Sequence, residues 1–187
     1  SQSCTRVAEG TERRGKRMKP NVLFLVVDDL RPQLGCYGHE QMITPHIDRL
    51  AERGVRFDRA YCQVPVCGAS RASVLTGARP TRSRFVDYSS WADEDLPGAV
   101  TLPEHFRRNG YTTLSDGKVF HHLPDAAERS WSEPPWFPVV PRKAGLWRNY
   151  AIPENRARAA DNNNHGPAYE CADVRDEAYF DGQIAER

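Results

Sequence analysis

The chain has 187 residues, of which 39% are hydrophobic and 27% are charged, a composition typical of a globular domain or of part of a larger one. The formal net charge of +1 by itself says nothing about nucleic acid or membranes, and the one apolar run is too short for a membrane span; we expect neither a nucleic acid nor a membrane among the partners. Five cysteines form an odd set without metal-site or disulfide-framework spacing, so the compartment stays undetermined.

The chain begins with a basic segment followed by an apolar one. Residues 1–20 hold six Lys or Arg against two Glu, a net charge of +4 (6 − 2), and we interpret 1–18 as a disordered leader. Residues 21–27 (NVLFLVV) are apolar and rich in branched side chains, which predicts a strand buried on both faces. The run is too short to be a signal-peptide core.

A strongly marked helix comes next. Thr44 is a candidate N-cap, Pro45 suits the first turn, and Gly54 ends the apolar periodicity. Residues 55–61 alternate enough to predict a short strand, and a short helix is predicted from about 69 to 76, ended by Gly77.

The second half of the chain repeats this alternation. Thr101 and Glu104 form a capping-box pattern at the start of a helix that Gly110 stops, and residues 111–115 predict a strand. Residues 124–168 lack periodicity and predict a long irregular segment. Alternating strands and helices predict an α/β fold with a largely parallel sheet flanked by helices.

Three groups of reactive side chains follow predicted strands. Asp28 and Asp29 end the first strand, Cys67 opens a helix, and Lys118 with His121 follow the strand at 111–115. Taken singly, the aspartates could be loop caps, Cys67 could be a buried thiol, and Lys118 and His121 could be solvated side chains. Ligands bind beyond the carboxyl ends of parallel strands, however, so together the groups predict one pocket.

The residue types in this pocket favour an anionic substrate and a hard cation. Arg71 lies four residues after Cys67, on the same helical face, and the helix amino end attracts anions. Paired carboxylates suit Ca²⁺ or Mg²⁺. The combination fits a tetrahedral oxyanion, with phosphate and sulfate esters as the candidate substrates.

The segment CGASRASVLTGARP (67–80) closely resembles the sulfatase signature, in which a Cys precedes a Ser-Arg pair and a Leu-Thr-Gly. The resemblance extends over about 19–123, through PNVLFLVVDDL, GCYG and TPHIDRLAERGVRF. LRPQLGCYG, VDYSSW and GKVFH look most like the iduronate-2-sulfatase-related branch. The resemblance to sulfatases implies an alkaline-phosphatase-like fold and a sulfated sugar or polysaccharide as substrate.

The resemblance also implies a covalent mechanism. A formylglycine-generating maturation enzyme would oxidise Cys67 to formylglycine, whose hydrate attacks sulfur. Asp28 and Asp29 would hold Ca²⁺, with Mg²⁺ less favoured, together with the hydrate oxygen of residue 67.

Three basic side chains complete the implied site. Arg71 would stabilise the hydrate and Lys118 would bridge the sulfate and the nucleophile. His121 would take the proton in the elimination step, with His122 as the competing candidate.

Some features depart from the family pattern. Ala69 replaces the commoner proline of the signature, and His46 stands where Asn is usual. The family's further metal ligands come from a later part of the chain, so we interpret 19–187 as the amino-terminal portion of a catalytic domain that needs its missing carboxyl-terminal part. DNNNH (161–165) is interpreted as a loop without a metal role.

Other functions remain open alongside sulfate ester hydrolysis. One is a truncated or inactive chain that keeps the fold and binds sulfated glycans. Another is a phosphonate or phosphate monoester hydrolase of the same superfamily. We also predict that the 187 residues alone are inactive, because they leave the metal ion incompletely coordinated.

Overall fold

A computed structural model describes residues 19–138, 150–162 and 166–187. The predicted leader at 1–18 and part of the predicted irregular segment lie outside these residues. The described elements are all helical, and none of these helices is long and apolar enough to cross a membrane. In chain order they are η1 (Gly35–Tyr37), α1 (Pro45–Arg53), α2 (Cys67–Thr76), α3 (Ala92–Asp95), α4 (Leu102–Arg108), α5 (Ala127–Ser130), α6 (Pro153–Asp161), η3 (Asp176–Ala178) and α7 (Phe180–Glu186).

The predicted parallel sheet is not formed by the described residues, which contain no β-strand. Residues 22–27 run extended but exposed, with Leu23 84% and Leu25 72% accessible. A strand buried on both faces needs neighbours that pair its backbone and cover its side chains, and the described residues supply none for this segment. The apolar run specifies extended backbone but not the partners that would make it a strand.

Among the described residues, short parallel pairing occurs within and just after the segment 111–115 that was predicted as a strand. The Ser132 N–H donates to the Thr113 carbonyl at 2.8 Å, and the Trp136 N–H donates to the Ser115 carbonyl at 2.9 Å. An isolated bridge joins Asp116 to Trp136. The pairing is too short to count as a strand, but it fixes the start of the loop that carries Lys118.

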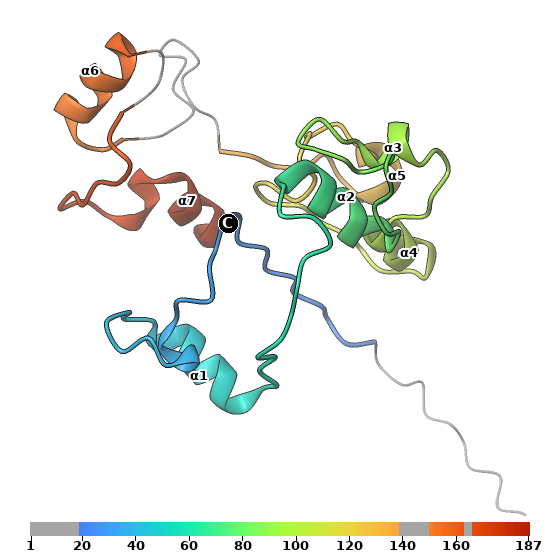
Figure 1. Cartoon of the computed structure of the whole chain (residues 1–187), viewed down its shortest axis with the longest axis horizontal. Helices are drawn as coiled ribbons and strands as arrows, with labels where there is room; N and C mark the ends of the chain where they lie inside the picture. Colours follow the sequence, from blue (N-terminus) through green and yellow to red (C-terminus); the bar gives the residue numbers. More distant parts are fainter. Residues whose placement is uncertain (1–18, 139–149, 163–165) are drawn as a thin grey trace, which may run out of the picture.

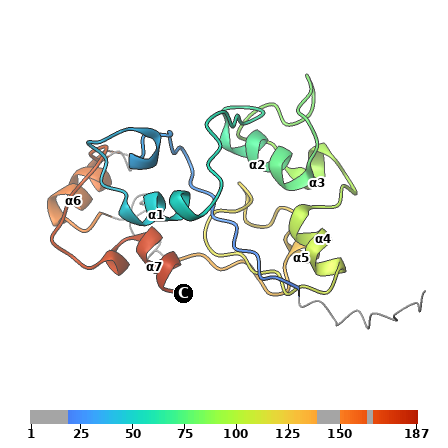
Figure 2. The ribbon, with the colours of Figure 1, turned by 90° about the horizontal axis from the view of Figure 1, so that it is seen from below.

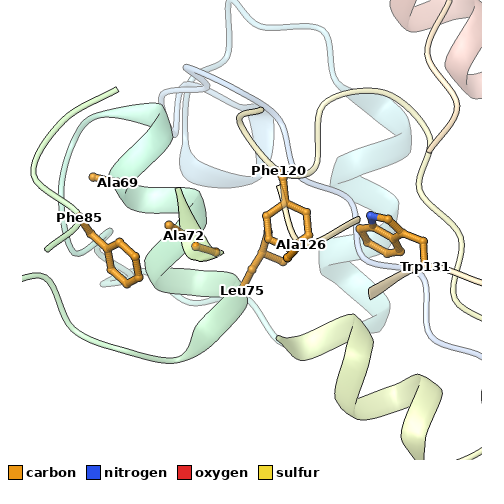
Figure 3. Close-up of a cluster of buried hydrophobic side chains, with 8 residues drawn as sticks. Ala69, Ala72, Leu75, Phe85, Phe120, Ala126 and Trp131 are labelled. Atoms are coloured by element: carbon orange, nitrogen blue, oxygen red, sulfur yellow. The ribbon is translucent and has the colours of Figure 1, made fainter. Parts of the chain in front are cut away.

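The helices do not form a single cluster (Figures 1 and 2). Helices α2, α3, α4 and α5 lie together, while α1, α6 and α7 lie apart from them in both views. The apolar core belongs to the group of α2, α3, α4 and α5 (Figure 3), where Phe120 lies between α2 and Trp131. The rings of Phe120 and Trp131 meet edge to face with centroids 6.0 Å apart. The buried members of this core are Ala69, Ala72, Leu75, Phe85, Ala92, Phe120, Ala126 and Trp131.

Local signals predict the helix ends well. Helix α1 begins at Pro45 as predicted, although the Thr44 hydroxyl donates to Asp48 Oδ1 instead of capping the backbone. Helix α2 begins at Cys67, two residues before the predicted 69, and ends at Gly77, whose φ of 69° is left-handed. A residue without Cβ adopts this conformation at no steric cost.

The predicted irregular segment at 124–168 is wrong in part, because it contains helices α5 and α6. Pro153 occupies the first turn of α6 and Glu154 follows it, a charge pattern that suits a helix amino end. Asp161 is the last residue of α6 instead of a loop residue, and Asn162 caps it. The remainder of DNNNH, 163–165, lies outside the described residues.

The capping box of α4 is confirmed and supports a stability prediction. The buried Thr101 hydroxyl accepts from the Glu104 N–H at 3.2 Å and pairs with Ser130 Oγ at 2.7 Å. Thr101→Ala removes both contacts and is expected to lower the free energy of unfolding by about 1–2 kcal/mol. Denaturant titration of the chain measures this change. Thr112→Ala, on an exposed threonine, is the control and should change stability by less than about 0.5 kcal/mol; equal effects of the two variants would contradict a special role for the cap.

Candidate active site

Cys67 is the first residue of α2, so the sequence was right to place it at a helix start, although the helix was expected to begin at about 69. Val66 before it is extended, and the Ser70 N–H donates to the Val66 carbonyl at 2.8 Å, which closes the first turn. Gly68 permits close packing here, because a Cβ at this residue would lie 2.3 Å from the Tyr88 carbonyl oxygen. The half-buried Cys67 therefore lies at a helix amino end against the segment around Tyr88.

Arg71, one turn after Cys67, is buried, with only 6% of the residue accessible. Its guanidinium Nη1 donates to the carbonyls of Lys118 and Val119, the latter at 2.9 Å. Nη2 donates to Asp28 Oδ1 at 3.0 Å. A planar guanidinium can bond several acceptors at once, so this side chain joins α2 to the Lys118 loop and to the end of the apolar run.

The Asp28 carboxylate accepts hydrogen bonds from two positively charged side chains, those of Lys118 and Arg71. Lys118 Nζ donates to Asp28 Oδ2, while Arg71 bonds the other oxygen, and about a third of the Asp28 side chain (34%) is accessible. Burial raises the pKa of this carboxyl, but the hydrogen bonds and charges of Lys118 and Arg71 outweigh burial and lower the pKa below its ordinary value. Asp28 is therefore a carboxylate at neutral pH.

The charges of this ion cluster act on His121. Burial lowers the pKa of its imidazole, and the positive charges of Lys118 and His122 lower it further, against the opposing effect of Asp28. The ring is therefore neutral at pH 7 and able to accept a proton. Its Nδ1 atom is buried and has no hydrogen-bond partner among the described residues.

The loop that carries Lys118 and His121 is anchored at both ends. Gly117 has a φ of 71°, its N–H donates to the Trp136 carbonyl at 2.9 Å, and a Cβ here would lie 2.5 Å from Cδ1 of Ile184 in α7. Phe120 is buried in the core between Lys118 and His121. The positions of Lys118 and His121 are thus fixed by the buried Phe120 between them and by Gly117, where a side chain would contact Ile184.

The three predicted metal ligands are not gathered as a set. Asp29 is exposed with a φ of 56°, and no contact links it or the Cys67 side chain to Asp28 among the described residues. In the part of the chain that the structure describes, no group of three or more His, Cys, Asp or Glu side chains could hold a metal ion. Carboxylate oxygens suit Ca²⁺ chemically, but this arrangement is short of ligands for it.

Sequence reasoning did not assign Trp91 or Asp125 to the site. The Trp91 ring stacks on His122 with centroids 4.1 Å apart and planes 9° from parallel. The Asp125 carboxylate accepts the N–H groups of Ala92 and Asp93 at 2.7 and 3.1 Å. No short-range signal could reveal these contacts, because they join residues about 30 positions apart.

Comparison with known proteins identifies the family of the chain. A family model described as Sulfatase matches residues 20–182 of the chain. The chain belongs to the sulfatase family. Membership implies the alkaline-phosphatase-like fold of that family, whose parallel sheet the described residues do not form.

Among sulfatases, the chain is similar to iduronate 2-sulfatases. It is 41% identical to iduronate 2-sulfatase of Homo sapiens over 143 residues, which are 74% of this chain and 26% of that protein. The identity to iduronate 2-sulfatase of Mus musculus is 45% over 123 residues, 63% of this chain and 22% of the relative. N-acetylglucosamine-6-O-sulfatase of Bacteroides thetaiotaomicron is 37% identical over 101 residues, 54% of this chain and 18% of the relative. The chain thus spans about a quarter of the length of these curated sulfatases.

Proposed function

We propose that this sulfatase chain is the amino-terminal part of a sulfuric ester hydrolase that removes sulfate from a sulfated sugar or polysaccharide. One observation carries the proposal: Cys67 begins α2, and Arg71 one turn later bonds both Asp28 and the backbone of the Lys118 loop. The nucleophile precursor and three charged groups are thereby tied together. The names of the relatives, iduronate 2-sulfatase and N-acetylglucosamine-6-O-sulfatase, support a sugar substrate.

The chemistry requires conversion of Cys67 to formylglycine by a maturation enzyme, and the aldehyde hydrate then supplies a nucleophilic oxygen and a route for sulfate release. The chain's own residues do the remaining work. Arg71 would orient and stabilise the hydrate, and Lys118 would bridge the sulfate and the nucleophile. His121, whose pKa is lowered, would accept the proton released at residue 67.

A divalent cation is the second part of the proposal. Asp28 and Asp29 would contribute carboxylate oxygens to Ca²⁺, the cation that fits these hard donors, with Mg²⁺ less favoured. The described residues do not complete such a site, so other ligands must come from elsewhere in the whole protein. Lys118 and Arg71 already neutralise Asp28 in this structure, and no step of the mechanism is assigned to the cation.

Mass spectrometry of the peptide that contains residue 67 tests the proposal most directly. Formylglycine lowers the mass by about 18 Da relative to cysteine. We expect the modified peptide together with hydrolysis of sulfated oligosaccharides by the complete protein. An unmodified thiol and no hydrolysis would favour a non-catalytic glycan-binding protein. Turnover of phosphate or phosphonate monoesters in place of sulfate esters would contradict the assigned substrate class.

Asp28→Asn is expected to weaken Ca²⁺ binding by the complete protein at least about tenfold, because one ligand charge is lost. Calorimetric titration with Ca²⁺ measures the affinity, and treatment of the parent protein with a chelator should reproduce the loss of activity. Asp58→Asn is the matched control, since Asp58 also pairs with an arginine, Arg56, but at the surface. Equal Ca²⁺ affinity of the Asp28 variant and the parent would show that Asp28 is not a ligand.

The 187-residue chain alone is expected not to hydrolyse sulfate esters, even with formylglycine at position 67. Two carboxylates leave Ca²⁺ short of the about six to eight oxygens that it normally binds. The exposed residues 22–27 also need a cover that the described residues lack. The test compares this chain with the product of the complete reading frame on an aryl sulfate and on sulfated oligosaccharides, with Ca²⁺ present. Comparable turnover by both would mean that the metal site is misplaced.

A further inference from the structure

The orientation of the His121 ring depends on a neighbouring ring instead of a hydrogen bond. In the described part of the chain, Nδ1 of His121 has no partner although it is buried, and Nε2 of His122 is in the same condition. The His121 ring meets the His122 ring edge to face, with centroids 4.6 Å apart and planes at 89°. Whatever fixes His122 therefore also fixes His121.

His122 is fixed by the stack on Trp91. The two planes are nearly parallel at 9°, and a centroid distance of 4.1 Å is close contact for aromatic rings. Both residues are half-buried. Flat stacking prevents the His122 ring from rotating about its side-chain bonds without loss of this contact.

Asp125 holds the backbones of the two segments together. Only 3% of this residue is accessible, and its own N–H donates to the His122 carbonyl at 3.0 Å. Its carboxylate accepts the N–H groups of Ala92 and Asp93, directly after Trp91. The turn that contains His122 and the segment that contains Trp91 are thus joined by hydrogen bonds to the Asp125 carboxylate as well as by the stacked rings.

We propose that Trp91, His122 and Asp125 form a clamp, and that this clamp fixes the orientation of the His121 imidazole. The charges of Lys118, His122, Asp28 and Arg71 act on this ring. The role of the clamp in turnover rests on the proposed function of His121 as proton acceptor. The three clamp residues act through His121 and do not themselves contact the reacting atoms. His122, which the sequence left as an alternative to His121, is in this proposal a positioning residue.

Nuclear magnetic resonance of the histidine rings tests the geometry without any substrate. In the parent chain, we expect nuclear Overhauser contacts between the rings of His121 and His122. Trp91→Ala should remove these contacts and shift the His121 ring signals, whereas Trp91→Phe, which keeps a flat ring, should preserve them. His105, exposed on α4, is the internal control for an intact fold. Unchanged His121 signals in a folded Trp91→Ala chain would overturn the clamp.

A second pair of variants keeps the test decisive if Trp91→Ala does not fold. His122→Ala should release the His121 ring, and His122→Phe should hold it. In the complete protein, His122→Ala should lower kcat by about tenfold to hundredfold with KM changed less than about twofold, because misplaced catalytic groups affect the transition state most. Equal kcat for His122→Ala and His122→Phe would contradict the clamp. A complete parent protein without sulfatase activity would contradict the proposed function, and the ring signals would still decide on the clamp.

Discussion

Replacement of Cys67 by alanine is expected to abolish sulfate ester hydrolysis by the complete protein while leaving its stability nearly unchanged. Alanine cannot be oxidised to the aldehyde, so no nucleophile forms at the start of α2. The fold should tolerate the change, because Cys67 is half-buried and makes no side-chain cap for the helix. Initial rates with sulfated oligosaccharides measure the loss, and thermal unfolding of both proteins checks the fold.

Cys62→Ala provides the matched control for this experiment. Cys62 is an exposed cysteine in the loop that leads to α2, so its loss should leave turnover within about twofold of the parent, as for a surface substitution away from the site. Substantial activity in the Cys67→Ala protein would contradict the formylglycine assignment. Loss of activity in both variants would indicate a general requirement for thiols instead of a nucleophile at one position.

Arg71→Ala is expected to cause the largest loss of stability among single changes at the site, about 2–4 kcal/mol in the free energy of unfolding. The change leaves the carbonyls of Lys118 and Val119 without their buried donor and removes one of the two cations on Asp28. Denaturant titration measures the stability change. The activity of the complete protein should fall with it, because the Lys118 loop loses its link to α2.

Two further variants separate the shape of the Arg71 side chain from its charge. Arg71→Lys keeps the charge but has no planar fork, so it should recover only a small part of the lost stability. Arg175→Ala removes an arginine from a surface ion pair with Glu177 and should cost less than about 1 kcal/mol. A stability of Arg71→Lys equal to that of the parent would show that charge alone suffices and that the carbonyl bonds contribute little.

Short-range sequence signals predicted the local structure around the site. Pro45, Gly77 and the Thr101–Glu104 pair act within one helical turn, so their effect can be read from neighbouring letters. The spacing of Cys67 and Arg71 likewise placed both residues on one helix. These predictions succeeded because the physical interactions they depend on join residues no more than five positions apart.

Long-range partners were beyond such reasoning. The sequence put Arg71 in the pocket as a group facing the hydrate, but its hydrogen bonds go to Lys118 and Val119, 47 and 48 positions away, and to Asp28. The predicted parallel sheet is absent from the described residues for the same reason. The apolar sequence of residues 22–27 does not identify the strands that would pair with this segment. Helix α6 was missed because its few apolar residues give a weak amphipathic pattern.

The contact between Gly117 and Ile184 connects α7 to the site. Gly117 immediately precedes Lys118, and the space that a Cβ would take at this position is filled by the Ile184 side chain of α7. A displacement of α7 would therefore press on the backbone one peptide away from the lysine, without passing through α2. Gly117 is thus the place where α7 meets the backbone that precedes Lys118, the residue whose charge is paired with Asp28.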